Sequence, residues 1–178
     1  VSENLAVKVP NNVNLKYACF ATIAAIAMQG LRQSKIKIGE SCVVIGMGLI
    51  GQLTYKLIEA AGGHPIGVDI SKQQIDSVKK NGFKNIFKRD SNELINFINS
   101  ISQGHGVDSV IITAATNSLD PVNFAGEISR KKGKVVIVGA VPTGFHRENF
   151  YKKELNLIMS SSYGPGRYDV NYEQKGQD

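Results

Sequence analysis

Residues 42–51 read CVVIGMGLIG, and this stretch carries the strongest indication of the fold. Its first four residues, Cys42–Ile45, form a short apolar run typical of a strand that is buried on both faces. From Leu49 to Ala61 the apolar spacing becomes helical, and two glycines then end the predicted helix. The three glycines between strand and helix match the pattern G-x-G-x-x-G. The stretch therefore predicts a strand, a tight turn and a helix in direct succession.

Each glycine of this loop suits the approach of a phosphate group. Gly46 permits a sharp turn out of the strand, Gly48 has no Cβ to keep a diphosphate from the backbone, and Gly51 allows close packing of helix on strand. The free N–H groups at the start of the helix, at Leu49 and Ile50, would face the phosphates together with the helix dipole. A six-residue glycine pattern alone is weak, but its position between strand and helix strengthens it. A tight turn that binds no ligand is the alternative.

An acidic residue lies where a dinucleotide site requires one. Asp69 ends a second predicted strand, Ile66–Val68, and follows Gly51 by 18 residues. A carboxylate there can accept hydrogen bonds from both hydroxyls of an adenosine ribose and would repel a 2′-phosphate, so NAD(H) is favoured over NADP(H). Lys72 is close enough to weaken that preference, and Asp69 could instead cap the following helix. Ile70, the next residue, is assigned to the same pocket.

Strands and helices alternate along most of the chain. An Ala-rich helix is predicted over residues 15–31, before the first strand. The remaining predicted elements are a helix over residues 72–80, a strand over 85–87, a helix capped by Ser91 and ending near 102, a strand over 107–112, a helix over 118–129 and strands over 135–138 and 155–159. Because parallel strands need crossover connections, this order predicts an α/β fold with a doubly wound, mostly parallel Rossmann sheet and helices on both faces.

Three small residues that follow other predicted strands complete the expected pocket. In such sheets ligands bind beyond the carboxyl ends of the strands. Thr113 and Ala114 follow one strand and Gly139 follows another. Their small size would let a flat nicotinamide ring or a ribose lie against the backbone. Small residues at strand ends are also common in ordinary packing, so this observation is less specific than the glycine loop.

The composition is that of one compact globular domain. The chain has 178 residues, of which 42% are hydrophobic and 20% charged, and it contains 18 Gly and no Trp. These values exclude a disordered chain, collagen and a coiled coil. The net charge of +6 is spread over short clusters such as Lys79–Lys80 and Arg130–Lys132. We therefore expect a solvated basic surface and no nucleic-acid partner.

No membrane segment or disulfide framework is expected. The longest nearly apolar run, Ala18–Met28, is about half the length that a bilayer requires. The first residues show no signal peptide. Cys19 and Cys42 lie in apolar segments without a C-x-x-C pair, so both are expected to be buried, reduced thiols. We expect a cytoplasmic protein.

No catalytic or metal-binding residue can be assigned from the sequence. His64, His105 and His146 lie in loop contexts without acidic or cysteine partners at ligand spacing. No Tyr is followed four residues later by Lys, which excludes the acid/base pair of short-chain dehydrogenases. Neither a G-x-S-x-G nucleophile motif nor a Walker lysine occurs.

The combined motifs resemble the coenzyme-binding domain of the medium-chain, zinc-type alcohol dehydrogenases. The resemblance covers roughly residues 1–160 and is carried by Lys37–Gly51, Gly67–Ser71, Gly106–Ile111 and Gly133–Gly139. It implies an NAD(H)-binding domain of an oxidoreductase that transfers hydride together with a catalytic domain absent from this chain. Any zinc ligands would lie in that domain, so this segment alone is expected to be inactive. The resemblance also implies a homodimer that forms through the edge strand 155–159.

The end of the chain departs from the strand–helix alternation. Residues 160–166 cannot continue a regular element, and the polar residues after them are expected to be poorly anchored. Residues 151–169 resemble a subgroup in which the dehydrogenase is joined to a second oxidoreductase of the Gfo/Idh/MocA type. We therefore divide the chain into a lead-in segment over 1–13, a dinucleotide-binding domain over 14–160 and a tail over 161–178 that leads to a missing region.

Two other functions share part of this pattern. A regulatory nucleotide-sensing Rossmann domain has the same glycines and acid, but such domains usually begin at the first strand, whereas about 40 residues precede it here. A methyltransferase would have an acidic residue just before the glycine loop, where Val44 and Ile45 stand.

Overall fold

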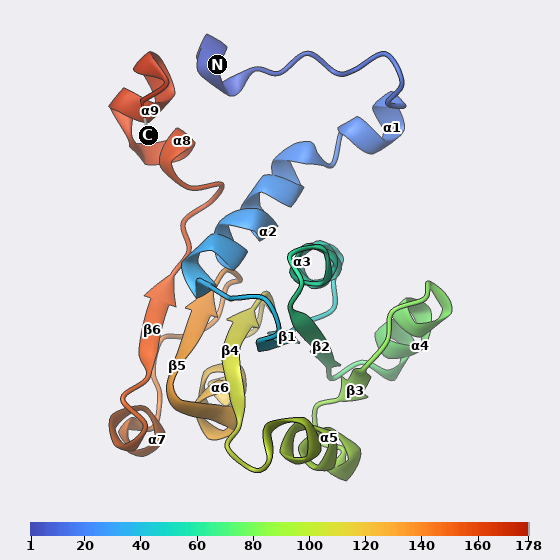
Figure 1. The fold of residues 1–178 in the computed structure, drawn as a ribbon, viewed down its shortest axis with the longest axis vertical. Helices are drawn as coiled ribbons and strands as arrows, with labels where there is room; N and C mark the ends of the chain where they lie inside the picture. Colours follow the sequence, from blue (N-terminus) through green and yellow to red (C-terminus); the bar gives the residue numbers. More distant parts are fainter. Residues whose placement is uncertain (178) are drawn as a thin grey trace.

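A computed structural model describes residues 1–177 and contains a six-stranded sheet in the order β3-β2-β1-β4-β5-β6 (Figure 1). All five strand pairs are parallel. The strands are β1 (Ser41–Ile45), β2 (His64–Asp69), β3 (Ile86–Lys88), β4 (Val107–Ile112), β5 (Ser129–Ile137) and β6 (Asn156–Met159). This order reverses direction between β1 and β4, as in doubly wound Rossmann sheets. The predicted fold class is confirmed.

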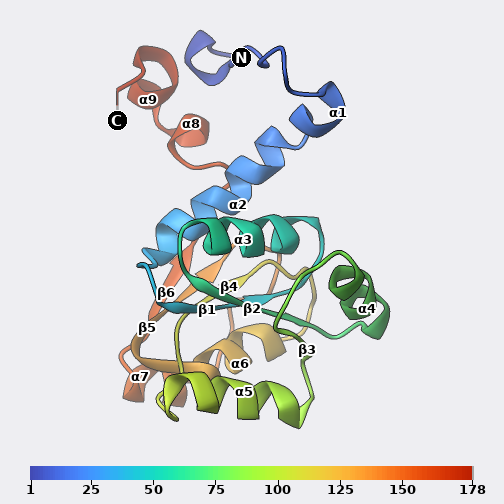
Figure 2. The same ribbon diagram turned by 45° about the vertical axis from the view of Figure 1, so that its right-hand side comes forward.

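Helices cover both faces of the sheet (Figure 2). They are α1 (Leu15–Ala18), α2 (Ala21–Ser34), α3 (Leu49–Ala60), α4 (Lys72–Lys80), α5 (Asn92–Ser102), α6 (Asp120–Ile128), α7 (Arg147–Lys152), α8 (Pro165–Tyr168) and α9 (Val170–Lys175), with a short 3-10 helix, η1, at Glu3–Leu5. Residues from α2, α3 and α4 pack on one face of the sheet, and residues from α5, α6 and α7 pack on the other.

The apolar run of β1 supplies both cores because successive side chains of a strand point to opposite faces. Val43 and Ile45 belong to the core beneath α5 and α6, whereas Cys42 and Val44 belong to the core beneath α3 and α4. All four residues are buried. A strand that is apolar on both faces must lie inside the sheet, and β1 is accordingly paired on both sides, with β2 and β4.

Several predicted boundaries agree with the structure because local signals set them. The hydroxyl of Ser91 accepts a hydrogen bond from the N–H of Leu94 at the start of α5, as the capping interpretation requires. The hydroxyl of Ser71 accepts from the N–H of Gln74 and caps α4 in the same way. Helix α4 has the predicted bounds, and strand β4 has the predicted bounds as well.

Other expectations need correction. The single helix predicted over residues 15–31 is two helices, because the chain bends at Cys19 and Phe20 between α1 and α2. Cys19 is exposed at this bend, so the prediction that both thiols are buried is wrong for Cys19. Strand β5 begins at Ser129 rather than at Val135, because its polar first half pairs with β4 across a register shift.

The tail is also better anchored than expected. The hydroxyl of Ser2 and the amide of Asn4 both donate to the backbone carbonyl of Glu173, which joins η1 to α9. The carboxylate of Asp169 caps α9 by accepting from the N–H groups of its second and third residues, Asn171 and Tyr172. The expectation of a poorly anchored tail is therefore wrong for the described part, while Asp178 lies outside the described residues. Among residues 1–177, no helix has both the length and the apolar character needed to span a bilayer.

Candidate functional site

The glycine loop is shaped by close backbone packing. Gly46 has a φ of +97°, and a Cβ there would lie 2.7 Å from the backbone N of Ala114. A Cβ at Gly51 would lie only 1.8 Å from the carbonyl oxygen of Gly46, so the first turn of α3 rests directly on the loop. The hydroxyl of Thr113 donates to the same carbonyl oxygen at 2.6 Å. These contacts fix the turn that leaves β1.

Gly48 differs from its neighbours because nothing packs against it. Its φ is −66°, which any residue can adopt, and a Cβ there would meet no atom within 4 Å. Gly48 is also the N-cap of α3, and no side chain caps that helix. The N–H groups of the first turn, beginning at Leu49, therefore have no intrahelical partner and lie beside open space. This arrangement forms a cradle that suits an anionic group.

Asp69 joins the end of β2 to the glycine loop. One carboxylate oxygen, Oδ2, accepts from the backbone N–H of Met47 at 2.8 Å, and the other, Oδ1, accepts from the N–H of Ser71 at 2.9 Å. The alternative role of Asp69 as the cap of the following helix is wrong, because Ser71 is the residue that caps α4. The bond to Met47 was not foreseen, because it joins positions 22 residues apart.

A cavity of about 650 Å³ lies at the carboxyl ends of β1, β2 and β4. Six predicted site residues line it: Gly46, Gly48, Asp69, Ile70, Thr113 and Ala114. Four others do not: Leu49, Ile50, Gly51 and Gly139. Gly51 packs behind the loop, and Gly139 packs against the backbone of Thr113 and Ala114, where a Cβ would lie 2.1 Å from a carbonyl oxygen. These two glycines shape the cavity rather than face it.

Two charged residues that line the cavity were not predicted from the sequence. Arg89 follows β3, Asp120 begins α6, and the two side chains form a two-point ion pair at 2.7 and 2.9 Å. The hydroxyl residues Thr116 and Ser118 also line the cavity. Arg89 comes directly after β3, and Asp69 is the last residue of β2. This position at the carboxyl end of a strand is the signal that could have identified Arg89. Nothing in the sequence indicated that it pairs with a residue 31 positions away.

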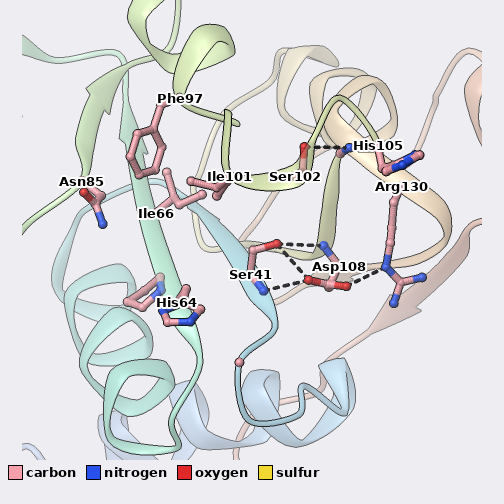
Figure 3. A pocket seen from close by; sticks show the side chains of 13 residues that line it. Ser41, His64, Ile66, Asn85, Phe97, Ile101, Ser102, His105, Asp108 and Arg130 are labelled. Atoms are coloured by element: carbon pink, nitrogen blue, oxygen red, sulfur yellow. Dashed lines mark hydrogen bonds and ion pairs between the residues drawn. The ribbon is translucent and has the colours of Figure 1, made fainter. Parts of the chain in front are cut away.

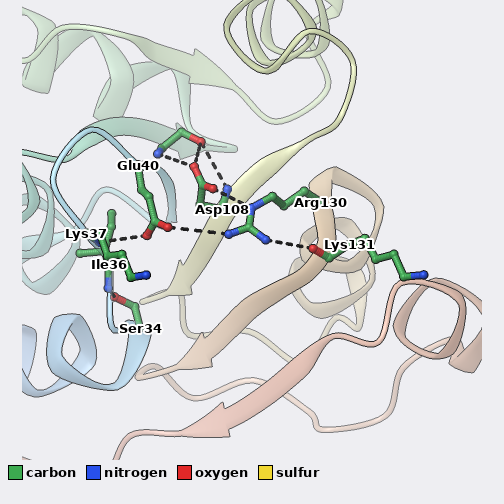
Figure 4. Close-up of polar contacts among 8 residues, drawn as sticks. Ser34, Ile36, Lys37, Glu40, Asp108, Arg130 and Lys131 are labelled. Carbon is green, nitrogen blue, oxygen red and sulfur yellow. Dashed lines mark hydrogen bonds and ion pairs between the residues drawn. The ribbon is translucent and has the colours of Figure 1, made fainter.

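A second cavity, of about 660 Å³, lies at the amino ends of β1, β2 and β4 (Figure 3). There the carboxylate of Asp108 accepts from the backbone N–H and the hydroxyl of Ser41 and from the Nε of Arg130. Figure 4 shows the guanidinium of Arg130 contacting both Asp108 and Glu40 and also donating to the carbonyl of Lys131. Because these polar groups satisfy one another and tie β1, β4 and β5 together, we interpret the network as structural.

The ion pair and hydrogen bonds of this network change the pKa of Asp108. Partial burial alone would raise the pKa of Asp108, but the hydrogen bonds from Arg130 and Ser41 outweigh it and hold the pKa below the ordinary value for Asp. Arg130, which the sequence placed in a solvated basic cluster, is therefore half-buried and paired.

The histidines do not form a metal site. His64, His105 and His146 are exposed. Within residues 1–177 there is no group of three or more His, Cys, Asp or Glu side chains that could hold a metal ion. This part of the chain does not fit a zinc ion, and no chemical step is assigned to one.

A parallel sheet in this strand order, with a glycine loop and an acid at its switch point, defines the class of Rossmann-type nucleotide-binding domains. The family model described as zinc-binding dehydrogenase matches residues 50–173. The chain belongs to the zinc-binding dehydrogenase family.

Individual relatives agree with this assignment. D-xylulose reductase A from Aspergillus oryzae is 29% identical over 94% of this chain and 48% of its own length. An uncharacterised zinc-type alcohol dehydrogenase-like protein from Haemophilus influenzae is 30% identical over 71% of this chain and 38% of its own length. A Sinorhizobium meliloti protein, described as a zinc-binding dehydrogenase and solved with NADP bound, has a TM-score of 0.75 at 22% identity, covering 96% of this chain and 52% of that one. The chain spans about half the length of the curated relatives it matches.

Proposed function

We propose that this chain is the nicotinamide-dinucleotide-binding domain of an oxidoreductase. The observation that carries the proposal is the open cradle at Gly48, at the N-terminus of α3, in one cavity with the carboxylate of Asp69. When bound, the dinucleotide supplies hydride transfer, and the domain holds and orients it. The family of the chain and the NADP bound to the Sinorhizobium relative support this proposal.

Each part of the dinucleotide has a matching surface in the cavity or directly beside it. The diphosphate would lie on the N–H groups of Leu49 and Ile50, beside Gly48. The adenosine ribose would reach Asp69, whose oxygens can each accept a further hydrogen bond besides those from Met47 and Ser71. The nicotinamide half would run past the small residues that follow β4, including Thr113 and Ala114, toward Gly139.

We propose NAD(H) rather than NADP(H) as the preferred cofactor. A 2′-phosphate at the ribose would lie against the Asp69 carboxylate, and like charges at contact distance repel strongly. Lys72, exposed in the first turn of α4, would offset part of this repulsion. The Sinorhizobium relative was solved with NADP, so the preference is a property that must be measured on this chain.

The complete activity would need a catalytic domain outside this chain. The relatives are about twice as long as the chain, and the described residues contain no zinc site and no assigned acid or base. We propose that such a domain supplies the substrate pocket and any zinc, and that residues 14–160 form the dinucleotide-binding domain between a lead-in over 1–13 and a tail over 161–178. Fusion to a Gfo/Idh/MocA-type oxidoreductase stays a prediction. The free thiols Cys19 and Cys42 are consistent with a cytoplasmic protein.

We also propose that two copies associate through β6. Within residues 1–177 this strand is at the edge of the sheet and pairs only with β5, and its last residue, Met159, is 58% exposed. An unpaired strand edge offers a row of hydrogen-bonding groups to a second copy. Light scattering at tens of micromolar should give twice the chain mass of 19.3 kDa, and a mass of one chain would contradict the proposal.

Calorimetric titration of the 178-residue chain with NADH tests the main proposal. We expect saturable one-site binding with a Kd below about 1 mM, within the usual range for enzyme ligands. NADPH titrated under the same conditions should bind more weakly. If neither NADH nor NAD⁺ gives a heat of binding at millimolar concentration, a dinucleotide-binding function is refuted.

A further inference from the structure

The ion pair between Arg89 and Asp120 is built more firmly than an ordinary surface pair. Nε of Arg89 donates to Oδ2 of Asp120 at 2.9 Å, and a terminal guanidinium nitrogen donates to Oδ1 at 2.7 Å. The guanidinium carbon also lies 3.5 Å from the ring centroid of Phe124, which is buried. A planar cation held by two hydrogen bonds and an aromatic ring has little freedom to reorient.

The pair faces the cavity rather than the outer surface. Arg89 and Asp120 both line the cavity, and their side chains are 24% and 47% exposed. The neighbouring ion pair, between Lys88 and Asp90, is more exposed, at 49% and 69%, and does not line the cavity. The backbone N–H of Arg89 donates to the carbonyl of Asp69, so the pair is attached directly beside the proposed ribose site.

The strand order assigns the pair to the base of the dinucleotide, because β3, which Arg89 follows, lies on the side of β2 away from β1 and the glycine loop. This step rests on the proposed function, which places the diphosphate at Gly48 and the adenosine ribose at Asp69. The base must then lie beyond the ribose, away from the glycine loop. The walls there are formed by Ile70, which is 76% exposed, and by the Arg89–Asp120 pair with Pro121. An apolar side chain and a fixed carboxylate thus line the same cavity.

We propose that Asp120 recognises the exocyclic amino group of the adenine base, with Arg89 acting as the positioning residue for its carboxylate. An ionised carboxylate only accepts hydrogen bonds, and each oxygen can accept a second one beside that from Arg89. Adenine presents an amino donor at C6, whereas hypoxanthine presents a carbonyl acceptor at the same position. The pair therefore favours a base with a 6-amino group.

The experiment compares NADH with its hypoxanthine analogue, reduced nicotinamide hypoxanthine dinucleotide, by calorimetry on the 178-residue chain. We expect the chain to bind NADH about fivefold more tightly than the analogue. With the analogue, the hydrogen bond to the partly exposed Asp120 carboxylate is lost, and the carbonyl oxygen of the base faces a carboxylate oxygen instead. Asp120→Asn keeps an oxygen for Arg89 and adds an NH₂ donor, so the ratio of the two Kd values should fall to about one or invert. Asp90→Asn, in the outward pair, should leave the ratio unchanged.

The outcomes separate this inference from the proposed function. If neither dinucleotide binds the unmodified chain, the proposed function fails and the inference fails with it. If NADH binds but the unmodified chain does not discriminate between the two bases, only the inference fails, and this measurement needs no variant. If Asp120→Asn weakens both ligands equally while circular dichroism shows a folded chain, the pair is only structural and base recognition is refuted.

Discussion

The carboxylate of Asp69 accepts a hydrogen bond from the backbone N–H of Met47 at 2.8 Å. The acid that ends β2 therefore holds the middle of the glycine loop that follows β1. The carbonyl of Met47 in turn accepts from the side-chain amides of Gln52 and Gln74. The proposed diphosphate and ribose sites are thus parts of one hydrogen-bonded unit, and a change at Asp69 should affect both.

Asp69→Asn should lower both the stability of the glycine loop and the affinity for NADH. The amide has one acceptor oxygen for two backbone N–H groups, those of Met47 and Ser71, so unfolding should become easier by about 1 kcal/mol. The Kd for NADH should rise about tenfold or more, because a neutral amide replaces a charged acceptor at the ribose. Urea unfolding and calorimetry measure the two effects. Asp76→Asn, on the exposed side of α4, is the control, and an unchanged Kd for Asp69→Asn would contradict a ribose-binding role.

Two alanine substitutions in the glycine motif should affect different properties, one the stability of the fold and the other the affinity for NADH. Gly51→Ala places a Cβ on the carbonyl of Gly46 and should destabilise the fold by on the order of 3 kcal/mol. Gly48→Ala meets no protein atom within 4 Å, so the melting temperature should move by no more than about 3 °C while the affinity for NADH falls about tenfold. Thermal melts and NADH titrations check this. Normal NADH binding by a folded Gly48→Ala variant would count against the cradle.

The Asp108 network should stabilise the fold only while the acid is ionised. Its pKa is below the ordinary value, so its contribution is present at neutral pH and is lost as the pH falls through the folded-state pKa, below about pH 4. Asp108→Asn should therefore cost about 1 kcal/mol at pH 7, with the difference shrinking toward pH 3. Urea unfolding at several pH values measures it.

Glu148→Gln is the matched control for Asp108→Asn. Its ion pair with Lys152 also lowers the pKa of Glu148, but both side chains are 70% exposed, so no measurable loss of stability is expected. Equal stability of Asp108→Asn and the unmodified chain at pH 7 would show that the network at β1, β4 and β5 is not stabilising.

The two thiols should react very differently with alkylating reagents. Burial raises the pKa of Cys42 to about 12, and the side chain has no exposed surface, whereas Cys19 is exposed. Iodoacetamide at pH 8 should modify one thiol in the native chain and two in denaturant, as counted by mass spectrometry. Rapid modification of Cys42 in the native chain would contradict the packing of β1.

The sequence predicted the features that local patterns determine. The glycine loop, Asp69 at a strand end and the cap at Ser91 each depend on residues close together in the chain, and the structure agrees on all three positions. The contacts that were missed join distant positions. The Arg89–Asp120 pair and the anchoring of α9 by Ser2 depend on tertiary packing, which periodicity and capping do not encode.

The most direct test of the account is to locate bound NADH by its effect on backbone amide resonances of the isotope-labelled chain. We predict that the largest chemical-shift changes fall on Met47, Gly48 and Leu49, with further changes at Asp69 and Thr113, at the carboxyl ends of the strands. Changes confined to the opposite cavity, around Ser41 and His105, or no changes at saturating NADH, would contradict the central claim.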